Sequence, residues 1–300
     1  MDYTAWARWY DLVYSLAPAG DVGFYVRLAR KAIDGPCPSD LRNSGGVILE
    51  LGAGTGRIAI PTALAGANIT AIDLHAEMLD RAEAKAIASG LNVIRDGRRL
   101  ISKDKRSPYS RPPPTVELIQ ADMRTLNLGR TFRLIAIPSN TLLLATTKRD
   151  QLSTLKHAAA HLAPGGLLAF DIFNPTSALL SDRSETPFLW GETTNPENGR
   201  TCRIYAINRF DTRRQLNHGT QIIEEIPGDV SLPLKERAGV RGHGARRIEL
   251  DILIRYLHPS EAHLLIESAG LTVTELYGDF DLSPFTATNP RMVFTCARRR

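Results

Sequence analysis

The chain has 300 residues and a formal net charge of +5, and 43% of its residues are hydrophobic and 23% charged. These values are typical of an ordinary soluble globular protein. No apolar run reaches the roughly 20 residues of a membrane-spanning helix, and no basic segment precedes an apolar stretch at the start, so we expect a cytoplasmic protein without a membrane partner. Cys37, Cys202 and Cys296 are too widely spaced to predict a metal site or a disulfide framework.

Two helices are predicted before the first strand. Apolar and aromatic residues recur at helical spacing over residues 3–16 and predict the first helix. The second helix is predicted over residues 22–33 and ends at the glycine and prolines that follow. We assign residues 1–44 to a helical lid.

Strands and helices then alternate along the chain. Short apolar runs predict strands over residues 47–51, 69–73, 116–120, 132–137 and 167–173. Helices are predicted between them over residues 55–64, 76–88 and 148–162, the first with a kink at Pro61. This alternation is typical of a doubly wound α/β fold with a mainly parallel sheet.

Two segments depart from this alternation. Residues 92–114 contain seven basic residues and four prolines, which predict a surface insertion without regular structure. Longer and more polar strands, without helices between them, are predicted over residues 201–209, 221–226 and 246–256. We expect residues 174–257 to form an antiparallel accessory sheet on the substrate side, inserted into an α/β domain that comprises residues 45–173 and 258–300. A helix over 259–269, stopped by Gly270, and strands over 271–277 and 292–297 complete that domain.

The glycine-rich segment Gly52-Ala53-Gly54-Thr55-Gly56 follows the first strand and precedes a helix. Glycines allow a tight turn and the close approach of a ligand to the backbone. The spacing is G-x-G-x-G, and Arg57 stands where the dinucleotide fingerprint G-x-G-x-x-G needs its third glycine. The loop therefore suits a ligand without a pyrophosphate, and the alternative is a plain glycine turn.

Two acidic residues follow neighbouring strands. Asp73 ends the second strand, and ligands of open α/β sheets lie beyond the carboxyl ends of the strands. Its carboxylate can accept hydrogen bonds from both hydroxyls of a ribose, and the alternative is a helix cap. Asp122 follows the third strand and can accept a hydrogen bond from an adenine amino group, or it is a turn aspartate.

These segments resemble the class I S-adenosylmethionine-dependent methyltransferases, whose fold is Rossmann-like. The matching segments are V-I-L-E-L-G-A-G-T-G-R at 47–57, I-T-A-I-D-L-H-A-E-M-L at 69–79, I-Q-A-D-M-R at 119–124 and H-L-A-P-G-G-L-L-A-F-D at 161–171. Tyrosine-containing segments at 10–14, 256–257 and 277–280 resemble the bacterial branch that acts on small molecules such as amino sugars and natural products. The resemblance covers most of the chain except residues 92–114 and much of 174–245.

The resemblance implies that S-adenosylmethionine is the cofactor and that its methyl group is transferred in line to a nitrogen or oxygen of a small-molecule acceptor. It implies a cofactor pocket formed by Tyr10, Tyr14, Glu50, Gly52, Gly54, Gly56, Asp73, Leu74, Asp122, Met123 and Pro138. Ser139 and Asn140 are expected to face the transferring methyl group, and we assign neither of these two as a base. Tyr14 and Asn140 are the candidate catalytic residues. For Tyr10 and Tyr14 the alternative is a packed face of an amphipathic helix.

Other functions remain as alternatives. The basic residues of 92–111 and of 298–300 suggest an enzyme that methylates RNA. Tyr109 is the one aromatic residue of the insertion, which disfavours RNA because single-stranded recognition depends on stacking, so we expect no nucleic-acid partner. A cofactor-binding protein without catalysis is a further alternative, and the glycine spacing disfavours a nucleotide-linked oxidoreductase.

Overall fold

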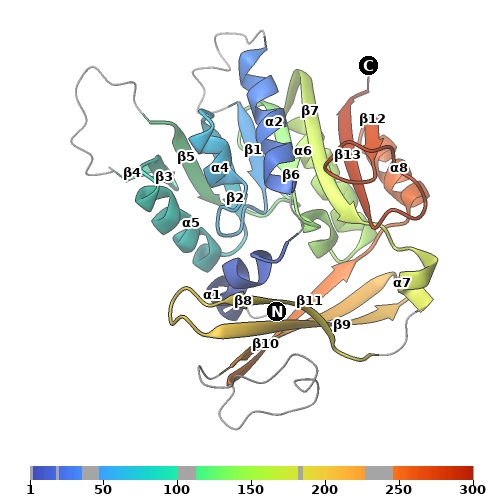
Figure 1. The fold of residues 1–300 in the computed structure, drawn as a ribbon. Coiled ribbons are helices and arrows are strands. Elements are labelled where there is room, and N and C mark those ends of the chain that lie inside the picture. Colours follow the sequence, from blue (N-terminus) through green and yellow to red (C-terminus); the bar gives the residue numbers. More distant parts are fainter. Residues whose placement is uncertain are drawn as a thin grey trace.

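The computed structural model describes residues 3–17, 20–35, 47–100, 113–181, 185–226 and 246–299. These residues form a nine-stranded sheet with helices on both faces and a separate four-stranded sheet, which lies next to the carboxyl ends of the parallel strands (Figure 1). In spatial order the large sheet contains β12 (Leu271–Tyr277), β13 (Arg291–Arg298), β7 (Leu162–Phe173), β6 (Phe132–Ile137), β1 (Ile48–Leu51), β2 (Ile69–Asp73), β5 (Thr115–Gln120), β3 (Asn92–Arg95) and β4 (Arg98–Leu100). The strands from β7 to β3 are parallel, whereas β13, β12 and β4 pair antiparallel.

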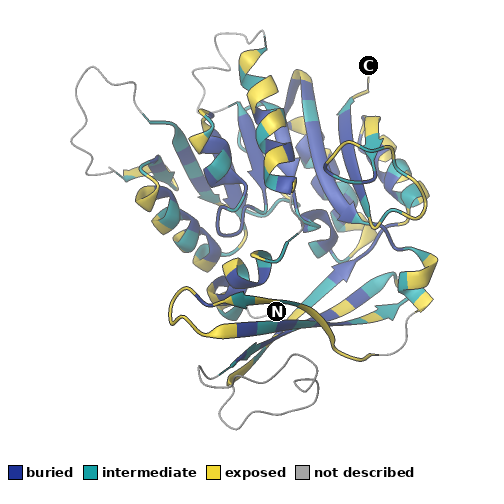
Figure 2. Ribbon diagram, viewed as in Figure 1, coloured by how far each residue is buried: buried dark blue, intermediate teal, exposed yellow. Residues whose placement is uncertain are grey.

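Helices cover both faces of this sheet, which explains the uninterrupted apolar runs of its strands. On one face, α2 (Asp21–Asp34), α4 (Ala59–Leu64) and α5 (Ala76–Ala88) share a core with Ile48. On the other face, α6 (Lys148–Ala160) and α8 (Pro259–Ser268) share a core with Leu49 and Leu51. Figure 2 shows the buried strands between their partly exposed helices. The predicted doubly wound fold with an inserted antiparallel sheet is confirmed.

Two details of the α/β domain differ from the prediction. The helix after the glycine loop begins only at Ala59, so Pro61 lies in its first turn, a position that tolerates proline, and not in the helix interior as predicted. The insertion was expected to lack regular structure, but its first residues form β3 and β4, and β3 extends the parallel sheet beside β5. Residues 101–112 lie outside the described part of the chain.

The accessory sheet has the order β11-β10-β9-β8 and is antiparallel throughout. Its strands are β8 (Phe188–Thr194), β9 (Thr201–Asp211), β10 (Leu216–Glu225) and β11 (Arg246–Arg255). The sequence analysis missed β8, because most of its residues are exposed and no apolar face alternates along it. The short helix α7 (Ser177–Ser181) leads from β7 towards this sheet.

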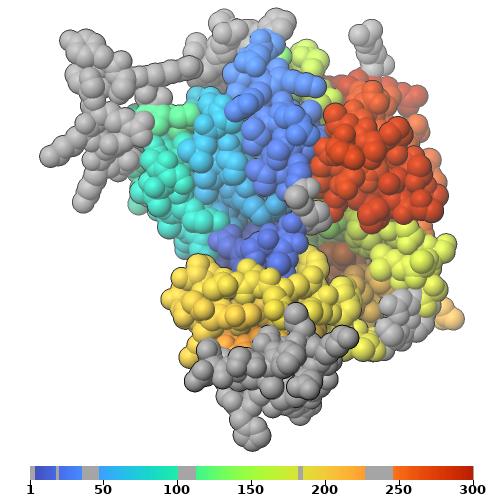
Figure 3. Space-filling model, viewed as in Figure 1, coloured from blue at the N-terminus to red at the C-terminus, as the bar shows by residue number. Residues whose placement is uncertain are grey.

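The first helix, α1 (Tyr3–Tyr14), packs on the accessory sheet. Trp6, Trp9 and Val13 form one apolar cluster with residues of the sheet, among them Ile204 and Leu250. The indole N–H of Trp6 also donates to the carbonyl oxygen of Asp251 at 2.8 Å. In the view of Figure 3, α1 in dark blue lies between the accessory sheet and the α/β domain, whereas α2 packs on the large sheet.

A buried polar network joins the accessory sheet to the α/β domain. The guanidinium of Arg255, at the end of β11, donates to Gln151 of α6 at 2.8 Å, to Glu261 of α8 at 2.7 Å and to Gln215 at 2.8 Å. Gln151 in turn donates to the carbonyl oxygen of Arg255 at 2.8 Å. Burial would raise the pKa of Glu261, but the hydrogen bonds from Arg255 and Gln215 hold it below its usual value. Each member of the network therefore has partners from another element.

Replacing Arg255 by alanine is expected to destabilise the protein by about 1–3 kcal/mol, because the buried Gln151 and the half-buried Glu261 then lose their hydrogen-bond partner. Urea unfolding measures this as a lower midpoint. Arg214→Ala is the control, since this side chain is 79% exposed, and it should change stability by less than about 0.5 kcal/mol. Equal midpoints for the two variants would contradict a structural role for the network.

Candidate functional site

The glycine loop needs its three glycines for different physical reasons. Gly52, Gly54 and Gly56 have φ angles of +70°, +55° and +82°, which favour glycine. A Cβ atom on Gly52 would lie 2.2 Å from Cγ2 of Thr141, and one on Gly54 would lie 3.5 Å from the ring of Tyr10. At Gly56 a Cβ atom would meet Ile60 at 2.9 Å and Ala82 at 3.3 Å. Gly56 therefore allows helix packing, while the bare backbone of Gly54 faces Tyr10.

The carboxylate of Asp73 joins the ends of β1 and β2. It accepts hydrogen bonds from the backbone N–H of Gly54 at 2.8 Å and of His75 at 3.0 Å. The N-cap of α5 is His75, so Asp73 stabilises the turn before the helix and is not its cap. This contact holds the glycine loop against the second strand.

A cavity of about 730 Å³ lies between these strand ends and the accessory sheet. Its size is typical of a small-molecule site. Of the residues predicted from sequence, the cavity is lined by Tyr10, Tyr14, Gly52, Gly54, Asp73, Leu74, Asp122, Met123 and Asn140. Glu50, Gly56 and Pro138 are not among the lining residues. Trp6 of α1 and residues of the accessory strands, which the sequence analysis did not name individually, complete the wall.

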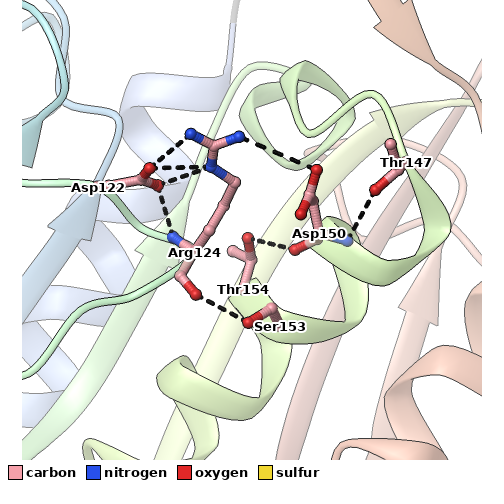
Figure 4. Close-up of polar contacts among 6 residues, drawn as sticks. All are labelled: Asp122, Arg124, Thr147, Asp150, Ser153 and Thr154. Atoms are coloured by element: carbon pink, nitrogen blue, oxygen red, sulfur yellow. Dashed lines mark hydrogen bonds and ion pairs between the residues drawn. The ribbon is translucent and has the colours of Figure 1, made fainter.

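Asp122 is held by its neighbour Arg124 (Figure 4). The carboxylate accepts hydrogen bonds from Nε of Arg124 at 2.9 Å, from its Nη2 at 2.6 Å and from its backbone N–H at 2.8 Å. These hydrogen bonds lower the pKa of Asp122 below its usual value. Ser153 of α6 donates to the carbonyl oxygen of Arg124 at 2.8 Å and thereby anchors the turn. The contacts are those of a turn aspartate whose side chain also borders the cavity.

A second buried network, not predicted from sequence, supports the loop after β6. The hydroxyl of Tyr25 and the backbone N–H of Ser139 both donate to Oδ1 of Asp171, at 2.7 and 2.9 Å. Arg57 forms an ion pair with Asp21 at 2.6 Å and also donates to the hydroxyl of Ser139. Burial raises the pKa of Asp171, although both hydrogen bonds oppose this shift. The signal in the sequence was an aspartate inside the apolar run of β7.

Asn140 occupies a strained turn. Ser139 and Asn140 have φ angles of +60° and +62°, which is uncommon for two consecutive residues other than glycine. The side-chain oxygen of Asn140 accepts a hydrogen bond from the backbone N–H of Phe173 at 2.7 Å. The backbone N–H of Asn140 donates to the backbone carbonyl oxygen of Asp171. The 3-10 helix η1 (Thr141–Leu144) begins directly after it. The carboxamide therefore stabilises the turn that brings Asn140 to the cavity.

Tyr10 and Tyr14 stack on one another with ring centroids 4.2 Å apart, and the guanidinium of Arg57 lies 5.3 Å from the ring centroid of Tyr14. Burial raises the pKa of both phenols, and for Tyr10 the neighbouring Tyr14 raises it further. Both hydroxyls therefore stay protonated near neutral pH, so neither tyrosine can act as a phenolate base there.

Glu50 lies behind the glycine loop and is buried. Burial raises the pKa of its carboxyl group to about 8, although Arg57 and the backbone N–H of Ala59 oppose this and the nearby Asp73 adds to it. Within the described part of the chain, no group hydrogen-bonds its Oε2 atom. Glu50 is therefore protonated near pH 7 in this arrangement.

Two further observations concern the described residues as a whole. None of their helices is long and apolar enough to cross a membrane. None of their histidine, cysteine, aspartate and glutamate residues form a group of three or more that could hold a metal ion. Cys202 and Cys296 are buried free thiols, and Cys37 lies outside the described ranges.

Comparison with known proteins agrees with this geometry. Residues 27–219 match the protein family described as "Methyltransferase domain". The "Cypemycin N-terminal methyltransferase" of a Streptomyces species is 30% identical over 167 residues, or 55% of this chain and 54% of that protein, so the chain matches about half the length of this relative.

Solved structures share the fold over almost the whole chain. The CcbJ methyltransferase from Streptomyces caelestis has a TM-score of 0.67 at 20% identity, and the match covers 94% of this chain and 97% of that one. CalS10 from Micromonospora echinaspora, described as an amino pentose methyltransferase with bound S-adenosylmethionine, has a TM-score of 0.62 at 18% identity and covers 96% of each chain. At these identities the likeness establishes the fold.

The raised pKa of Glu50 predicts a specific dependence of stability on pH. Between about pH 4.5 and pH 8 the folded protein retains a proton that the unfolded chain has lost, so the free energy of unfolding should fall as the pH rises through this window. Glu50→Gln has no such titration. Its stability relative to the wild type should therefore increase between about pH 5 and pH 9 in urea unfolding experiments. Glu77→Gln, on the exposed start of α5, is the control, and a pH-independent difference for Glu50→Gln would contradict the prediction.

Proposed function

Because this chain belongs to the methyltransferase domain family, we propose that it transfers a methyl group from S-adenosylmethionine to a nitrogen or oxygen atom of a small molecule. The observation that carries the proposal is that the glycine loop and the accessory sheet border one shared cavity. One wall is formed by the carboxyl ends of the α/β strands, where ligands bind in open α/β sheets. The other wall is formed by the accessory strands, which provide a separate surface for an acceptor. A cavity with two such walls brings two small molecules into contact.

The residues of the α/β wall fit the cofactor. The bare backbone of Gly54 leaves space opposite Tyr10, and a side chain at Gly52 would collide with Thr141. Asp73 and Leu74 border the cavity beside this loop, where a carboxylate can hold ribose hydroxyls and an exposed leucine can contact adenine. When bound, S-adenosylmethionine supplies a methyl group already activated on a sulfonium.

The contribution of the protein is then orientation and exclusion of water. Holding two reactants in line can lower such a barrier by roughly 7–11 kcal/mol. Tyr14, Asn140 and the accessory strands border the same cavity and can orient the acceptor. The protonated Tyr14 phenol and the hydrogen-bonded Asn140 carboxamide do not accept a proton, so we propose that they position groups. A base is needed only for a protonated nucleophile.

The alternative of RNA methylation receives no support from a described contact. The basic insertion begins with β3 and β4, which lie at the far edge of the sheet from β7, and its remainder lies outside the described residues. We retain the proposals of a cytoplasmic enzyme with a small-molecule acceptor and of residues 1–44 as a lid. Among the described residues of this segment, those of α1 line the cavity.

Asp73→Asn should weaken binding of S-adenosylhomocysteine about tenfold or more, because hydrogen bonds to a charged group contribute roughly 1.5–3 kcal/mol each. Isothermal titration calorimetry measures this, with Asp80→Asn on the exposed side of α5 as the control. The wild type should not bind NAD, since the loop lacks the third glycine of the dinucleotide fingerprint. Tight NAD binding without binding of S-adenosylhomocysteine would end the proposal.

Closure of α1 over the cofactor predicts slower amide hydrogen exchange in residues 3–14 when S-adenosylhomocysteine is bound, because Tyr10 and Tyr14 border the cavity. Exchange in α8 should not change, since none of its residues line the cavity. Equal protection of α1 in both states would indicate static packing and argue against a lid.

A further inference from the structure

The two walls of the cavity differ in charge. The ionisable side chains of the α/β wall are Asp73, His75, Asp122 and Arg124. By contrast, the described residues of the accessory strands that line the cavity are all uncharged, and they include Trp190, Asn208, Phe210, Asn217, Gln221 and Ile252. Successive residues of a strand point to opposite faces. Arg209 accordingly forms its ion pair, 3.0 Å from Glu185, while the neighbouring Asn208 lines the cavity.

A chain of hydrogen bonds fixes which end of Asn208 faces the cavity. The backbone N–H of Arg209 can only donate, and it donates to Oδ1 of Asn217 at 3.2 Å. The Nδ2 group of Asn217 must therefore point the other way, and it donates to Oδ1 of Asn208 at 2.8 Å. Asn208 is left with its Nδ2 group, which no described residue accepts. A donor of fixed identity is thus presented at the accessory wall.

Gly219 allows the side chain of Ile252 to pack closely beside this donor. Gly219 pairs with both Asn208 and Ile252, and a Cβ atom at Gly219 would lie 2.8 Å from Cγ2 of Ile252. Two residues further along the same face, Oε1 of Gln221 is buried, and none of the described residues hydrogen-bonds it. A donor and an acceptor therefore lie on the same cavity-lining face of the accessory sheet, among mostly apolar and aromatic residues.

We propose, on the basis of the methyltransferase function above, that this wall binds an uncharged, ring-containing acceptor with an oxygen atom for Nδ2 of Asn208 and an N–H or O–H group for Oε1 of Gln221. A phosphate or carboxylate on the acceptor is disfavoured, because an anion buried without a cation loses its hydration. An acceptor that lacks the oxygen leaves the half-buried Asn208 donor without a partner, and sites built to hydrogen-bond a substrate group discriminate against analogues that lack it. The described accessory-strand residues that line the cavity include no carboxylate, so burial against this wall favours the neutral form of an amine, whose lone pair is then free for methylation.

Three matched amines test the proposal on the full chain saturated with S-adenosylhomocysteine. They are 4-acetylbenzylamine, its isostere 4-isopropylbenzylamine, which lacks the oxygen, and 4-carboxybenzylamine, which adds an anion. Calorimetry should show the acetyl compound binding about fivefold more tightly than the isopropyl compound, the net effect of one hydrogen bond. The carboxyl compound should bind at least about tenfold more weakly than the acetyl compound, because burial of an unpaired anion is costly.

Asn208→Asp isolates the donor, because the aspartate still accepts from Nδ2 of Asn217 but presents an oxygen to the cavity. The preference for the acetyl compound should disappear in this variant and persist in Asn127→Asp, which adds the same charge on an exposed loop. The proposal is overturned if the carboxyl compound binds as tightly as the acetyl compound, if Asn208→Asp keeps the preference, or if no amine binds to a protein that binds S-adenosylhomocysteine. Failure to bind S-adenosylhomocysteine itself would instead overturn the proposed function.

Discussion

Parallel strands that end at one edge of a sheet are the constraint on which the site depends. Strand β1 lies between β2 and β6, so the chain leaves the sheet in different directions at their carboxyl ends and opens a crevice. On one side of this crevice lies the glycine loop, which the hydrogen bond from Gly54 to Asp73 holds in place. On the other side lies the strained turn at Ser139 and Asn140. The glycine loop, the acidic residues and the turn after β6 thus meet because the sheet brings them together.

The accessory sheet converts this crevice into a cavity. It joins the α/β domain through α1 and through the buried network around Arg255, so its position relative to the glycine loop depends on packing as well as on hydrogen bonds. Arg57, which follows the glycine loop, connects the two N-terminal helices. It forms an ion pair with Asp21 at the start of α2, and its guanidinium lies over the ring of Tyr14 of α1. Movement of α1 would therefore change contacts of both the loop and the accessory sheet.

The two walls of the cavity differ in the charge of their side chains. The α/β wall carries charges, which suit a cofactor with ribose hydroxyls and ionic groups, whereas the accessory wall carries carboxamides and aromatic rings. Burial raises the pKa of Tyr10 and Tyr14, which line the cavity, and of Glu50 behind the glycine loop, so these three groups stay protonated near neutral pH. Transfer of an already activated methyl group is compatible with such surroundings, because the reaction depends on alignment of the acceptor atom with the methyl group more than on proton transfer.

The sequence by itself determined the order of strands and helices, the glycine loop and the acidic strand ends, because these depend on local periodicity and on residues close together in the chain. It also indicated an antiparallel insertion, but it missed β8, most of whose residues are exposed, and β3 and β4, which are short and mostly not buried. Only the tertiary structure decided that Gly56 packs a helix, that Arg124 holds Asp122, and that Asp21, Arg57 and Asp171 support the site. The uncharged acceptor wall likewise arises from register between β9 and β10, because residues 208 and 217 become neighbours only when those strands pair.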